Sequence, residues 1–103
     1  MSSLDLVIKA ISSKTNPKKI ILFGSFAYGN PTSVSDLDVA VIQNGPAKLG
    51  QSSKVFLALN KLGYDWKVEP DIHFFSEKEF EKKLKNKDLF ISEIAKGKTV
   101  YVQ

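Results

Sequence analysis

The 103-residue chain is 43% hydrophobic and 25% charged, proportions typical of a folded globular domain rather than a disordered or fibrous chain. It has no cysteine, which excludes disulfides and thiolate metal sites. All 15 basic residues are lysine, so the net charge of +4 comes without guanidinium groups, and nucleic acid is not the expected partner. We expect a single domain over residues 1–103. Because neither a signal peptide nor a bilayer-length apolar run is present, we also expect a cytoplasmic location without membrane contact.

The first part of the chain predicts a helix, a strand and a turn. Apolar residues recur at helical spacing from Leu4 to Ile11, behind two serines that can cap the helix, and Asn16-Pro17 ends it. Residues 19–23 form a short apolar run typical of a strand. After this strand, Gly24-Ser25 predicts a turn into a brief helical segment over residues 25–28. A loop that contains Asn30-Pro31 follows this segment.

The rest of the chain alternates between strands and helices. The pattern predicts strands over residues 37–42, 71–75 and 99–102, and helices that cover residues 55–62, 76–85 and 88–96. Gly63 and Gly97 are placed at the C-terminal ends of two of these helices. The sequence therefore predicts an α/β fold of the α+β kind, in which a small mixed β-sheet packs against helices.

Two aspartates lie at the start of the second predicted strand. Asp36 and Asp38 project to the same side of the strand because they are two residues apart. Close carboxylates raise each other's pKa unless a cation or hydrogen bonds compensate them. Asp71 begins the third strand and adds another acid, and oxygen ligands favour Mg²⁺ or Mn²⁺. The alternative is that Asp36 belongs to an ordinary polar turn.

The Gly24-Ser25 turn fits the same kind of site. Glycine allows a ligand to approach the backbone closely, and the N–H groups at the start of a helix attract phosphate oxygens. The Ser25 hydroxyl adds a hydrogen-bond donor. A Gly-Ser pair after a strand is also a common plain turn, so its order relative to the acidic strands is what favours a phosphate site.

The stretch GSFAYGNPTSVSDLDVAV (residues 24–41) resembles the Gly-Ser and Asp-x-Asp signature of the minimal nucleotidyltransferases of the DNA polymerase beta superfamily. EPDIHFF (residues 69–75) resembles the strand that carries their third carboxylate. The resemblance implies the nucleotidyltransferase fold and assigns a role to each matching residue. Gly24 and Ser25 would hold the terminal phosphates of the nucleotide, Asp36 and Asp38 would ligate two metal ions, and Asp71 would bind one ion and help to deprotonate the acceptor hydroxyl.

This resemblance also implies an activity. It predicts a Mg²⁺- or Mn²⁺-dependent enzyme that moves a nucleoside monophosphate, AMP from ATP, onto a hydroxyl acceptor. In this family the domain often pairs with a small helical protein of the HEPN class, as antitoxin to toxin. The alternative is a non-catalytic module that neutralises such a partner by contact. The three acids favour the enzyme, whereas Phe26 and Tyr28, which stand where members often carry arginine, favour the alternative. The sequence leaves open whether the protein forms a homo-oligomer.

Three further sets of residues are candidates for the same site. His73 lies on the strand face of Asp71 and is either a packed histidine or a member of the site. Three aromatic residues could stack on a base or pack in the core or at its rim: Tyr28, Tyr64 and Trp66. Three lysines could meet phosphates, and the sequence does not choose among them: Lys18, Lys48 and Lys54.

Overall fold

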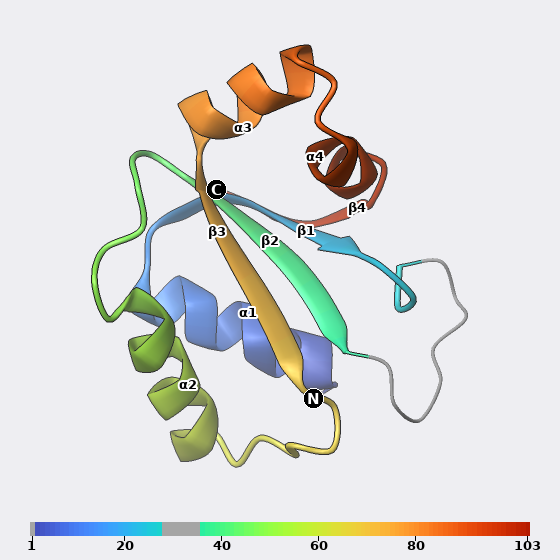
Figure 1. Cartoon of the computed structure of the whole chain (residues 1–103). Helices are drawn as coiled ribbons and strands as arrows, with labels where there is room; N and C mark the ends of the chain where they lie inside the picture. The colour runs from blue at the N-terminus through green and yellow to red at the C-terminus, as the bar shows by residue number, and fades with distance from the viewer. Residues whose placement is uncertain (1, 28–35) are drawn as a thin grey trace.

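The computed structural model describes residues 2–27 and 36–103 and has helices on both faces of a four-stranded sheet (Figure 1). The predicted small mixed sheet packed against helices is confirmed. In chain order the elements are α1 (Ser3–Lys14), β1 (Pro17–Phe23), β2 (Leu37–Gln43), α2 (Gln51–Lys61), β3 (Pro70–Ser76), α3 (Glu77–Lys85), α4 (Leu89–Ala95) and β4 (Lys98–Val102). Among the described residues, no helix has the length and apolar character needed to cross a bilayer.

The strands lie in the order β3-β2-β1-β4, so β4 is an edge strand. β1 runs antiparallel to both β2 and β4, whereas β2 and β3 are parallel. Asp38 of β2 therefore pairs in register with Phe23, near the end of β1, and with Asp71, near the start of β3. This register brings the starts of two strands and the end of a third to one edge of the sheet.

The sheet separates two apolar cores, which the alternation of side chains along β2 explains. Leu37, Val39 and Val41 are buried in the core beneath α1 and α2. Ala40 and Ile42 point to the other face and are buried beneath α3 and α4. Asp38 shares that second face. Protein therefore covers this face of β2 beyond Asp38.

Helix starts follow their capping residues. Ser2 forms a capping box with Asp5 at the start of α1, and the Ser76 hydroxyl accepts the Glu79 N–H at the start of α3. Asp88 caps α4 in the same way through the N–H of Ile91. These local hydrogen bonds explain why the predicted starts of α1, α3 and α4 are close to the observed ones. α2 has no side-chain cap and begins at Gln51, four residues before the predicted start.

Gly63 and Gly97 both follow the C-cap residue of a helix, as predicted, but glycine is needed at the two positions for different reasons. Gly63 follows the C-cap of α2 in the left-handed conformation, with φ +73°. The C-cap of α4 is Lys96, and Gly97 is not among the residues with positive φ. A Cβ at Gly97 would instead collide with the carbonyl oxygen of Leu22. Glycine is required there because the chain passes close to β1.

The prediction of a helical segment over residues 25–28 is wrong within the described part of the chain. Residues 24–27 form a turn closed by a 3.0 Å hydrogen bond from the Ala27 N–H to the Gly24 carbonyl. One such bond makes a turn rather than a helix. Residue 28 and the predicted loop with Asn30-Pro31 lie outside the described residues.

Candidate active site

Two carboxylates meet at the edge where β2 and β3 begin. The parallel register places Asp38 directly beside Asp71, and Asp38 is partly buried while the Asp71 side chain is 51% exposed. The sequence placed these two acids at the starts of separate strands, and the parallel pairing makes them neighbours. The structure therefore forms a partly solvated acidic mouth.

His73 completes a group of three potential ligands. It lies two residues after Asp71 on the same face of β3, and its Nε2 is 3.2 Å from Asp71 Oδ2. One ligand atom each from Asp38, Asp71 and His73 lies within 4.8 Å of the others. The imidazole ring also packs against Phe23 and Phe90, with ring centroids 5.7 and 5.3 Å away. Both interpretations of His73 thus hold, because its ring packs while a nitrogen faces the acid.

Asp36 lies outside this group. It is exposed and directly precedes β2, whose first residue, Leu37, donates its N–H to the Glu69 carbonyl at 2.8 Å. The charge of its carboxylate raises the pKa of Asp38. The structure therefore brings two of the three predicted acids together, adds a histidine, and leaves Asp36 at the rim.

The electrostatics of the mouth favour a cation. Burial raises the pKa of Asp38 above its usual value, and the charges of Asp71 and then Asp36 raise it further, whereas His73 lowers it. The neighbouring protein groups thus leave the Asp38 carboxylate with a net electrostatic penalty. Carboxylate oxygens suit Mg²⁺ and Mn²⁺, and an imidazole nitrogen is compatible with Mn²⁺ and other transition metals. The donor set and its unbalanced charge therefore fit a divalent cation.

The Gly24-Ser25 turn lies against the acids. Gly24 has φ +76°, and a Cβ built there would collide with Oδ2 of Asp38. The absence of a side chain thus lets the backbone at the end of β1 touch the carboxylate. Ser25 follows in the turn, and Phe26 packs partly buried against the core beneath α1 and α2. Phe26 therefore has a packing role at a position where relatives often carry arginine.

The other aromatic candidates have packing partners of their own. Tyr64 is buried and its hydroxyl donates to the Val68 carbonyl, and the Trp66 indole N–H donates to the Asn60 side chain at 2.9 Å. Tyr28 lies outside the described residues. The structure thus supports the packing interpretation of Tyr64 and Trp66.

The lysine candidates lie away from the acidic mouth. Lys18 pairs with Glu77 at 3.1 Å. Lys48 and Lys54 line a pocket at the other end of β2. None of the three is therefore placed to bind a phosphate held at Asp38 and Asp71.

Comparison with known families agrees with this geometry. Residues 4–102 match the family model of the nucleotidyltransferase domain, so the chain belongs to this family, within the polymerase beta-like superfamily. It is a nucleotidyl-transfer enzyme. Members of the family generally use a nucleoside triphosphate and a divalent metal, for which the acidic mouth offers ligands. A search of curated proteins gave no match.

Proposed function

We propose that the protein transfers AMP from ATP to a hydroxyl group on a partner protein in the cytoplasm, with Mg²⁺ or Mn²⁺ as its metal. The observation that carries the proposal is the meeting of Asp38 and Asp71 beside the Gly24-Ser25 turn. This arrangement offers anionic ligands for cations and an open backbone for phosphate within one short edge of the sheet.

Each residue has a role in this proposal. Asp38 and Asp71 hold a divalent cation together, and Asp36, which lies outside their group in this structure, would supply a further ligand from the start of β2. The cations, when bound, would supply positive charge to the triphosphate and favour the ionised acceptor oxygen. Gly24 and Ser25 bind the terminal phosphates. His73 holds the Asp71 carboxylate in place through their 3.2 Å contact, while Phe23 and Phe90 fix the imidazole ring.

The reaction is a displacement at the α-phosphorus of ATP. The acceptor oxygen forms a bond to this phosphorus while the bond to the oxygen that bridges to the β-phosphate breaks. The hydroxyl proton passes to the Asp71 carboxylate and then to solvent. Pyrophosphate leaves, and AMP stays attached to the acceptor through a phosphodiester.

The proposed acceptor is a hydroxyl, such as that of a tyrosine, on a small helical protein of the HEPN class. The resemblance to minimal nucleotidyltransferases supports this choice, and the partly exposed acids support it as well, since a macromolecular acceptor must reach them from solvent. In this proposal the two proteins form a toxin–antitoxin pair in which modification silences the partner.

The experiment combines the protein, Mg²⁺, the helical protein encoded beside it, and ATP labelled at either the α- or the γ-phosphate. We expect the α-label alone to reach the partner, whose intact mass rises by one AMP unit. Asp71→Asn should lower transfer by about 10³-fold or more, because the acceptor proton loses its base and the cation a ligand charge. Glu69→Gln removes an exposed carboxylate two residues away and should leave the rate within about twofold.

A different outcome would favour the non-catalytic module. If the unmodified protein binds and silences its partner without label transfer under Mg²⁺ or Mn²⁺, and Asp71→Asn does the same, the proposed transfer to this partner is wrong. Transfer of the γ-label would likewise overturn it, since that would be phosphorylation.

A further inference from the structure

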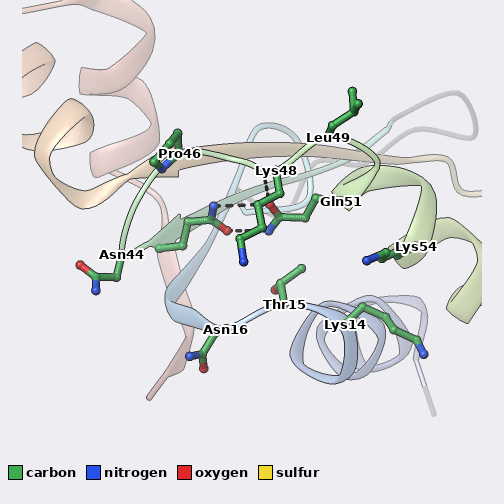
Figure 2. A pocket seen from close by; sticks show the side chains of 10 residues that line it. Lys14, Thr15, Asn16, Asn44, Pro46, Lys48, Leu49, Gln51 and Lys54 are labelled. Atoms are coloured by element: carbon green, nitrogen blue, oxygen red, sulfur yellow. Dashed lines mark hydrogen bonds between the residues drawn. The ribbon is translucent and has the colours of Figure 1, made fainter.

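A pocket of about 420 Å³ opens at the C-terminal end of β2, where the loop after Gln43 faces the end of α1 and the start of α2 (Figure 2). Its lining includes Lys14, Lys48 and Lys54, and among the described residues it contains no acid. A volume of this size is within the range of small-molecule sites. The pocket is therefore both large enough and of the right charge for a small anion.

A paired set of side-chain amides gives this pocket a defined floor. Gln43 is 7% exposed, and its Oε1 accepts a 2.6 Å hydrogen bond from Nε2 of Gln51. Gln51 Oε1 in turn accepts the Lys48 N–H at 2.8 Å, and Gln43 Nε2 donates to the Gly45 carbonyl. These bonds tie the loop to the start of α2, so the pocket exists without a ligand to organise it.

Positive charge converges on the pocket from two elements. Figure 2 shows Lys48 reaching into it from the loop and Lys54 from α2, while Lys14 lies at the rim on α1. In the described part of the chain none of these three lysines forms an ion pair. No side chain caps α2 at Gly50 and no acid lies in its first turn, so the helix dipole adds to this charge. The lysines thus lack a counter-charge.

We propose that this pocket, which we call the lysine pocket, binds a small molecule through a phosphate group. The site is separate from the acids, because Gln43 lies five residues after Asp38, a distance of about 17 Å along an extended strand. Lysine is a common phosphate ligand that acts as a point charge. The phosphate could be free, as in pyrophosphate, or carried by a nucleotide such as AMP, and the two are separated by experiment.

The test titrates pyrophosphate and AMP separately into ¹⁵N-labelled protein in metal-depleted buffer and follows the backbone amide signals by NMR. Without a cation, Asp38 and Asp71 repel phosphate, so binding at the acidic mouth is suppressed. We expect saturable shifts at Lys48, Gln51 and their neighbours, and none at Gly24. Stronger binding of AMP than of pyrophosphate would assign the ligand as a nucleotide, and the reverse would assign it as a free phosphate compound.

A matched pair of double variants separates a specific site from general charge attraction. Lys48→Gln with Lys54→Gln should weaken binding by about tenfold or more, as expected for the loss of charged ligands. Lys61→Gln with Lys67→Gln removes the same charge from exposed residues outside the pocket lining and should change affinity less than about twofold. An equal loss in both double variants, shifts without saturation, or no shifts at millimolar ligand would overturn the proposal.

Discussion

At the C-terminal end of β2 the buried side chain of Gln43 finds its hydrogen-bond partners within the protein, in Gln51 and the Gly45 carbonyl. At the N-terminal end of the same strand Asp38 lies beside another acid, and its pKa is raised by burial and by Asp71. The polar groups at one end are therefore satisfied within the protein, whereas the other end carries a carboxylate whose charge the neighbouring protein groups oppose.

This difference indicates which end performs the chemistry. Polar groups that serve the fold are normally paired, as Gln43 is. Ionised carboxylates that repel each other lower the stability of the folded state. Such pairs are therefore typical of sites where a bound ligand compensates their negative charge. The lysine pocket combines both properties, because its amides are paired while its lysines have no counter-charge in the described part of the chain. Each of the following substitutions tests one side of this contrast.

Among these substitutions, the largest effect is expected at Gly24. Gly24→Ala should lower nucleotidyl transfer by about 100-fold or more, because the new Cβ must displace the Asp38 carboxylate. Its left-handed φ should also lower the free energy of unfolding by about 1–2 kcal/mol. Gly63→Ala is the control, since φ is +73° there against +76° at Gly24, and a Cβ would meet nothing within 4 Å. Transfer assays and urea unfolding of both variants give the two quantities.

Equal transfer by the two glycine variants would show that Gly24 serves only the turn. A loss of transfer confined to Gly24→Ala, at equal loss of stability, would show that close approach to Asp38 is what the acidic mouth requires.

The positions of Asp38 and Asp71 at the starts of two strands could be predicted from the sequence, because the signals for them are local. Period-two alternation places Asp38 on the opposite face of its strand from Leu37 and Val39. Asp71 is the first residue of the next predicted strand. Helix starts were predictable for the same reason, since Ser76 and Asp88 bind N–H groups three residues ahead. Short-range geometry is what a single sequence encodes most directly.

What could not be predicted depends on segments distant in the chain. Gly97 is required by the Leu22 carbonyl, which no neighbouring residue reveals. The sequence does not decide the role of His73, because this role depends on contacts with Phe23 and Phe90 as well as with Asp71. The lysine pocket needs the end of α1, the end of β2 and the start of α2 together. Its floor residue Gln43 gave no signal, because it lies just beyond the predicted strand.

A smaller effect is expected at the paired end of β2. Gln43→Ala should lower the free energy of unfolding by about 1–3 kcal/mol, because it removes buried side-chain volume and leaves the Gln51 amide without its partner. Asn44→Ala, at the exposed neighbouring position, should change it by less than about 0.5 kcal/mol. Urea unfolding measures both, and a double variant with Gln51→Ala gives the coupling between the two amides. No coupling would mean that the amide pair does not hold the pocket floor.

The smallest effect, of opposite sign, is expected at Asp38. In metal-depleted buffer Asp38→Asn should raise the free energy of unfolding at neutral pH by about 0.5–1 kcal/mol, since it removes a carboxylate that Asp71 repels. The pKa of Asp38 is raised in the folded state above its ordinary value of 3.8. Between the ordinary and the raised pKa, the folded protein therefore binds more protons than the unfolded chain. Stability of the unmodified protein should therefore fall, relative to the variant, as pH rises through this window.

Urea unfolding of both proteins from about pH 3 to about pH 7 measures this difference, which should be near zero below the ordinary aspartate pKa and complete above the raised one. Asp65→Asn, at an exposed loop residue, controls for the loss of one negative charge. Mn²⁺ should then stabilise the unmodified protein and have a much smaller effect on Asp38→Asn, because binding to the folded state alone raises stability. A variant that is less stable than the unmodified protein across the whole range would mean that the protein compensates Asp38 internally. In that case the two ends of β2 would not differ, and the electrostatic argument for a cation at the acidic mouth would be lost.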